Sequence, residues 1–173
     1  MTINCKACEG LIEMSQFNHN YHAYMDYLYV EIFKKYLYNN KVYYNGKPIA
    51  LKKYPIECDR EYTFFHLTTV SDKKGIPFTD REPDLRRCER LHWIKPAIET
   101  NHLDLCYMDC FIPYTDNKKG KYPRVKFFNE LDRYLIVLED RGSYYLLITA
   151  FYIEQEYYLK GIIKEKDKAK NAP

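Results

Sequence analysis

The sequence predicts an α+β fold in which N-terminal helices precede a four-stranded antiparallel β-sheet meander and a C-terminal helix. Apolar residues recur with helical period in the first quarter of the chain. Short β-prone segments dominate the final third, and the connections between them are short enough to join antiparallel neighbours. At 173 residues, 46% of them hydrophobic, the chain has room for one sizeable core, so residues 1–173 are expected to form a single domain.

The first 60 residues predict a leader, a helix and a hairpin. Residues 1–10 show no periodic pattern and are expected to be loose, whereas residues 11–60 carry the helix and hairpin. The helix follows from apolar residues spaced three to four apart, namely Phe17, Tyr21, Met25, Leu28, Ile32 and Tyr36. An Asn-Gly pair in "KVYYNGKPIAL" predicts a tight hairpin turn, because both turn residues need positive φ.

Residues 61–159 are expected to form the main core. Its first segment, "EYTFFHLTTV", is aromatic and β-branched and predicts a buried strand, and the charged stretch 71–84 predicts a loop. Residues 84–98 predict a helix on which Arg86, Arg90 and Trp93 share one side, with Arg87 beside them.

The last third predicts the meander. Its four strands are expected in "HLDLCYMDCFI", "RVKFF", "RYLIVLE" and "SYYLLITAF", separated by "PYTDNKKGKYP", "NELD" and "DRG". A final helix, weakened at Gly161, is expected to fray into a basic tail at 160–173.

Composition narrows the function classes. The formal net charge of +3 is too mild to require nucleic acid as a partner, whereas 19 tyrosines offer many half-apolar rings. Without a secretory signal or an apolar span, the chain is expected in the cytoplasm and not in a membrane. No phosphate-binding loop or dinucleotide fingerprint occurs, so no cofactor is expected. "CKAC" and "CYMDC" have spacings compatible with zinc pairs, but their contexts favour no metal.

Three groups of residues are candidates for chemistry. His66 stands alone in an apolar run, either as a structural residue or as a proton carrier near neutral pH. Arg86, Arg87 and Arg90 repel one another unless a phosphate approaches, and Trp93 beside them offers a stacking surface for a base; a merely solvated face is the alternative.

A third candidate lies at the end of the last predicted strand. If the chain turns between Thr149 and Tyr152, their two hydroxyls can meet at the mouth of the sheet. Both residue types are also common structural choices in strands and helix starts.

Taken in order, "TFFHL", "RRCERLHWIKPAIE" and "YLIVLEDRGSYYLLITAFYIE" resemble the RlfA-like proteins related to phage P1. These belong to the superfamily of metal-independent ribonucleases that includes barnase, EndoU, colicin and RelE-like enzymes. The resemblance runs from about Asp26 to Tyr158. It implies a helix followed by a four-stranded antiparallel sheet, and an active site of histidine, a basic residue, Ser or Thr, and tyrosine.

Carried over by motif, the implied catalytic residues are His66, Arg87 or Arg90, Thr149 and Tyr152. Arg86 and Trp93 are expected to bind RNA because of their charge and stacking surface. Where the family often has "TAY", this chain reads "TAFY", so only Tyr152 keeps the phenol.

Together with these residues, the resemblance implies an endoribonuclease, a toxin of a phage or mobile-element system, that cleaves RNA by 2′-OH attack and leaves a 2′,3′-cyclic phosphate. His66 would be the base or the acid. RNA is the expected partner, and a toxic nuclease would also need an antitoxin or immunity protein. The alternative is a non-catalytic RNA- or protein-binding phage accessory factor.

Overall fold

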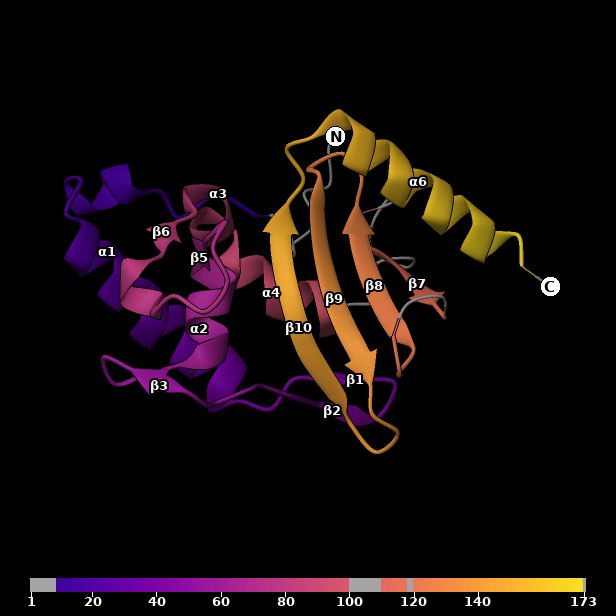
Figure 1. Cartoon of the computed structure of the whole chain (residues 1–173), viewed down its shortest axis with the longest axis horizontal. Helices are drawn as coiled ribbons and strands as arrows, with labels where there is room; N and C mark the ends of the chain where they lie inside the picture. Colours follow the sequence, from indigo (N-terminus) through magenta and orange to yellow (C-terminus); the bar gives the residue numbers. More distant parts are fainter. Residues whose placement is uncertain (1–8, 100–109, 118–119, 173) are drawn as a thin grey trace.

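The computed structural model describes residues 9–99, 110–117 and 120–172. The class is α+β, as predicted, with N-terminal helices beside a curled sheet and a C-terminal helix across it (Figure 1). Within these ranges, no helix is long and apolar enough to cross a membrane.

The N-terminal region is helical, as the period of its apolar residues predicts. Its elements are η2 (Met14–Phe17), α1 (Tyr21–Tyr27) and η3 (Leu28–Tyr38). Asn20 caps α1 by accepting a hydrogen bond from the amide of Ala23 at 3.1 Å. Because η3 continues α1 in a wider, π-type helix, the long predicted helix is confirmed with its start at Tyr21.

The predicted hairpin is also confirmed. Strands β1 (Tyr43–Tyr44) and β2 (Lys47–Ala50) pair antiparallel around Asn45 and Gly46. These two residues have φ of 48° and 75°, and glycine adopts positive φ without a steric penalty.

Within the described residues the main sheet has six strands in the order β1-β2-β10-β9-β8-β7. Its later strands are β7 (Ile112–Asp116), β8 (Arg124–Asn129), β9 (Tyr134–Asp140) and β10 (Tyr145–Tyr152), each antiparallel to the next. Strand β2 pairs in parallel with the start of β10. The four-stranded antiparallel sheet is therefore not confirmed in that form, because the N-terminal hairpin adds two strands and makes the sheet mixed.

The first strand of the last third also differs from expectation. Most of the segment predicted for it, 102–112, lies outside the described residues. Strand β7 instead occupies part of "PYTDNKKGKYP", which was expected to be a connection. Pro113 is tolerated there because β7 is the edge strand of the sheet.

The stretch that contains His66 is a helix, so the prediction of a strand is wrong. Helix α2 (Tyr62–Thr68) buries Phe64 against Tyr29 and Phe33 of η3, at centroid distances of 5.0 and 5.4 Å. The hydroxyl of Thr68 donates to the carbonyl of Phe64 at 2.8 Å, one turn back. Aromatic packing on η3 outweighs the β-propensity of the segment.

Two small ladders and a short helical turn flank α2. Strands β3 (Ile56–Glu57) and β4 (Arg60–Glu61) form one ladder, and β5 (Thr69–Val70) and β6 (Glu82–Pro83) form the other. Between β5 and β6 lies η4 (Phe78–Asp80). The stretch 71–84, predicted as an exposed loop, thus contains a structured part, and Phe78 is buried against Phe65.

The predicted helix 84–98 is divided. It consists of α3 (Leu85–Glu89), η5 (Leu91–Trp93) and α4 (Ile94–Glu99), and the break falls at Arg90, whose φ is −111° and ψ is 7°. The final helix α6 (Glu156–Lys170) runs through Gly161. The stretch 160–173 is therefore helical as far as Lys170, and the expectation of a frayed tail there is wrong.

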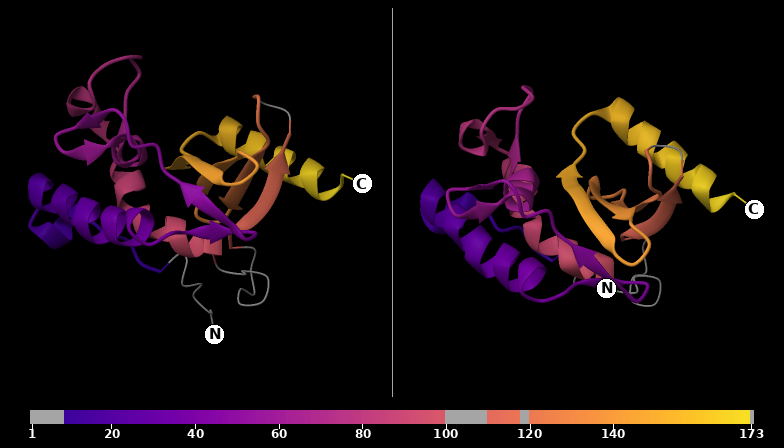
Figure 2. Two further views of the ribbon diagram at one scale, coloured as in Figure 1. Left: turned by 90° about the horizontal axis from the view of Figure 1, so that it is seen from below. Right: turned by 60° about the horizontal axis from the view of Figure 1, so that its bottom comes forward.

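The sheet carries a hydrophobic cluster on each face. The larger one joins the sheet to η3, α2 and α3–α4 and includes Phe33, Phe64, Leu91, Phe127 and Ala150. The smaller one lies under α6 and includes Phe128, Val137, Leu159 and Ile162. Figure 2 shows the sheet curling between the N-terminal helices and α6.

Candidate functional site

Helix α2 holds His66 one turn after Tyr62. Their rings stack at 5.6 Å between centroids with an interplanar angle of 13°. This is the contact that i, i+4 spacing creates on a helix. The imidazole is therefore held at a defined orientation on a partly buried surface.

The surroundings of His66 favour its neutral form. Burial, followed by the charges of Arg87, Arg81 and Lys52, lowers the pKa of His66 to about 4. Its Nδ1 is buried without a hydrogen-bond partner, and among the described residues no hydrogen bond reaches either ring nitrogen. A neutral imidazole can accept a proton, and the cations near it can attract an anion to the same surface.

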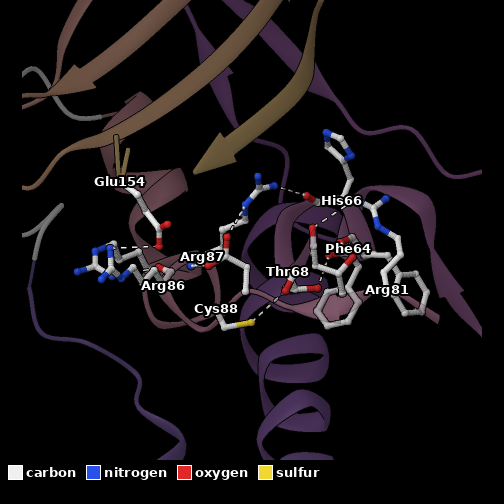
Figure 3. A network of polar contacts seen from close by, with 12 residues as sticks. Phe64, His66, Thr68, Arg81, Arg86, Arg87, Cys88 and Glu154 are labelled. Atoms are coloured by element: carbon white, nitrogen blue, oxygen red, sulfur yellow. Dashed lines mark hydrogen bonds and ion pairs between the residues drawn. The ribbon is translucent and has the colours of Figure 1, made fainter. Parts of the chain in front are cut away.

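Arg87 joins α3 to α2 at this point. Its Nη1 donates to the backbone carbonyl of His66 at 3.0 Å, and its Nε donates to Oδ2 of Asp84 at 3.1 Å. Asp84 also caps α3 by accepting from the Arg87 amide. In Figure 3, Arg87 lies between His66 on one side and Arg86 with Glu154 on the other.

Arg86 and Arg90 meet Tyr152 at the end of β10. Their guanidinium carbons lie 4.6 and 5.0 Å from the centre of the Tyr152 ring. Arg86 also pairs with Glu154 at 3.3 Å and is half exposed. The fold thus brings both arginines to the predicted tyrosine, from segments more than 60 residues apart.

An open groove of about 570 Å³ passes this ring. One wall is formed by β6 and the start of α3, and the other by the end of β10 and the start of α6. Side chains that line it include Arg86, Tyr152, Glu154, Tyr157 and Tyr158. The described lining of the groove therefore combines aromatic rings with acidic side chains and one arginine, Arg86.

The prediction that Trp93 is an exposed stacking surface is wrong. Its side chain is 3% exposed, its Nε1 donates to the carbonyl of Gly10 at 3.0 Å, and its ring packs edge-on against Tyr134. The ring keeps its predicted neighbour, because the guanidinium carbon of Arg90 lies 5.3 Å from its centre, but burial leaves no free face for a base. Gly10 belongs to the segment expected to be loose, but it is held in place by this bond.

Thr149 does not join Tyr152. No turn separates them, because both lie in β10, where Ile148 forms a bulge opposite β9. Ala150 and Tyr152 pack with the larger cluster, whereas Ile148 and Phe151 pack under α6. Strand alternation then puts Thr149 on the α6 face, so the idea that the two hydroxyls meet is wrong.

Three residues near His66 were not predicted, namely Lys52, Tyr62 and Arg81. Reading 61–70 as a helix would have paired Tyr62 with His66 by their spacing. Lys52 lies 4.1 Å from the Tyr62 ring centre, and Arg81 donates to the carbonyl of Thr69 at 3.4 Å. Neither of these two has a local sequence signal, since both come from connections.

Among the described residues, no group of three His, Cys, Asp or Glu side chains is placed to hold a metal ion. Cys58 is exposed, and Cys88 and Cys110 are buried thiols. The zinc alternative depends on Cys5, Cys8 and Cys106, which lie outside the described residues.

Comparisons with family models, with curated proteins and with solved structures find none that matches this chain. The resemblance to the ribonuclease superfamily therefore stays a prediction that depends on the motifs alone.

Proposed function

We propose that the protein is a metal-independent endoribonuclease whose proton acceptor is His66. The observation that carries the proposal is the position of His66, whose partly buried ring stacks on Tyr62 at 5.6 Å and lies near the cations Arg87, Arg81 and Lys52. An imidazole that is neutral at pH 7 is ready to take a proton, and cations beside it favour a phosphodiester.

In the proposed reaction, neutral His66 removes the proton of a ribose 2′-OH, and the 2′-oxygen attacks the adjacent phosphorus. The bond to the 5′-oxygen breaks, and this oxygen leaves with a proton from the new imidazolium or from water. Arg87, Arg81 and Lys52 would stabilise the charge that develops on the phosphorane. The products are a 2′,3′-cyclic phosphate and a free 5′-OH.

Arg86, Arg90 and Tyr152 would act outside this reacting centre. Tyr152 lines the groove and is contacted by both arginines, which supports a role in holding a base of the substrate. The proposal gives Thr149 and Trp93 no part in catalysis. A toxin role, with an antitoxin or immunity partner, is supported by the resemblance only.

The test is cleavage of end-labelled RNA by purified protein in excess EDTA. We expect 2′,3′-cyclic phosphate ends, and a rate lowered about 10²- to 10⁴-fold by His66→Gln. The exposed His22 on α1 provides a matched control, and His22→Gln should cleave like the unmodified protein. Circular dichroism checks that both variants fold.

Intact RNA in EDTA, or cleavage that returns only when a metal is added, would refute the proposal. RNA binding without turnover, unchanged by His66→Gln, would instead favour the non-catalytic accessory factor.

A further inference from the structure

Helix α6 has an outer face of lysines that takes no part in the proposed site. Lys160, Lys164 and Lys168 are exposed and recur every four residues. At 100° per residue they lie within about 80° of the helix circumference, opposite the buried residues Leu159 and Ile162.

None of these three lysines forms an ion pair within the described part of the chain. The acidic residues near them on the helix are Asp167, Glu156, which pairs with Arg133, and Glu165, which pairs with Lys126. The inward-facing lysine of the same helix behaves differently. Lys166 is buried and pairs with Glu130 at 2.7 Å. The lysine that faces the sheet is thus neutralised, whereas the outer three remain available to an anion.

The spacing of the outer lysines fits a polyanion. Four residues of α-helix rise about 6 Å, which is comparable with the spacing of successive phosphates along an extended strand. Tyr157 lies one turn before Lys160, on the same face, and is 74% exposed. Lysines with an exposed aromatic ring form the combination that holds a single strand by its phosphates and bases.

The helix also continues the path of the groove. Tyr157 lines the groove together with Arg86 and Tyr152. Arg86 is adjacent in the chain to Arg87, which contacts His66. From the end of β10, α6 extends away across the sheet (Figure 1). A strand that leaves the His66 site through the groove would therefore arrive at the first turn of α6.

We infer that the outer face of α6, with Tyr157, Lys160, Lys164 and Lys168, binds the backbone of single-stranded RNA next to the cleaved segment. This inference depends on the proposed function for the nature of the polyanion. Acidic Glu154 and Glu82 line the groove, so bases rather than phosphates would contact the protein there.

The test is fluorescence anisotropy of a labelled 15-nucleotide oligouridylate, in EDTA, with His66→Gln as the common background so that the RNA stays intact. We expect the triple variant K160Q/K164Q/K168Q to bind at least about tenfold more weakly at low salt. The slope of log affinity against log salt should fall in magnitude by about 2, since each single-strand phosphate contact contributes about 0.7.

The matched control removes three exposed lysines elsewhere, in the triple variant K41Q/K73Q/K74Q. An equal loss of affinity in the control, or an unchanged salt slope in the α6 variant, would overturn the inference. The inference would also be overturned if the α6 variant lost binding to phosphatidylserine vesicles but kept its RNA binding. The lysine face would then be a lipid-binding site. The anisotropy assay measures binding and not cleavage. A failure of this inference can therefore be distinguished from a failure of the proposed nuclease activity.

Discussion

Arg87 donates a hydrogen bond from Nη1 to the backbone carbonyl of His66 at 3.0 Å, and so joins α3 to α2. The same guanidinium lowers the pKa of the His66 imidazole. One arginine therefore contributes both to the packing of two helices and to the protonation state of the candidate base.

Replacing Arg87 should change both properties. In Arg87→Gln we expect the pKa of His66 to rise from about 4 towards 6.5, though only in part because burial is the larger cause. Unfolding free energy should fall by about 1–3 kcal/mol, since a charged hydrogen-bond donor with 17% exposure is lost. NMR titration of the imidazole protons and urea unfolding measure the two effects.

Arg86→Gln is the control, because Arg86 is half exposed and absent from the causes of the His66 shift. It should change stability by less than about 0.5 kcal/mol. If the pKa of His66 moves equally in both variants, the specific role of Arg87 is wrong.

The protein should lose stability as pH falls from about 6.5 to about 4. Because the pKa of His66 is lower in the folded state, the unfolded state binds more protons in this window, and the contribution present above pH 6.5 is lost below it. Allowing for solvent screening of a partly exposed group, we expect a loss of about 1 kcal/mol between pH 6.5 and pH 5. Urea unfolding at several pH values measures it.

His66→Gln should reduce this slope between pH 6.5 and pH 5, and the part that remains should belong to His92, whose pKa is also lowered by burial. The lowered pKa values of Glu61 and Asp140 act at more acidic pH, because carboxylates titrate lower than histidine. An unchanged slope in the His66→Gln variant would show that His66 does not cause it.

Trp93 should contribute to the stability of the fold and not to the affinity for RNA. Trp93→Phe removes the bond from the indole N–H to the Gly10 carbonyl and part of a buried, packed ring, so we expect a loss of unfolding free energy of about 2 kcal/mol. RNA affinity, measured by anisotropy at a temperature where the variant is folded, should stay within about twofold. A large loss of affinity at full folding would restore Trp93 as a contact.

Thr149 should be dispensable for cleavage. Thr149→Val keeps the β-branched shape in the strand and removes the hydroxyl, so we expect a cleavage rate within about threefold of the unmodified protein. The rate on labelled RNA in EDTA measures it. A loss as large as that of His66→Gln would mean that the hydroxyl does reach the substrate.

Short-range features of the sequence predicted the elements that depend on neighbours along the chain. The apolar period predicted the helix that α1 and η3 form, and the Asn45-Gly46 pair predicted the β1–β2 turn. Hydrogen bonding and side-chain sterics within a few residues determine these elements, so they follow from local sequence. The same holds for the helical turn that carries Arg86 and Arg87, which begins after the Asp84 cap.

Only the tertiary structure decided where the candidate site residues lie. Packing of Phe64 on η3 made a helix of a β-prone segment, and packing against Tyr134 buried Trp93. The unbroken run of β10 through Tyr152 put Thr149 and Tyr152 on opposite faces of the sheet, and the parallel pairing of β2 with β10 widened the sheet. Each outcome depends on contacts between distant segments, whose packing energy exceeds local preferences of about 1 kcal/mol per residue.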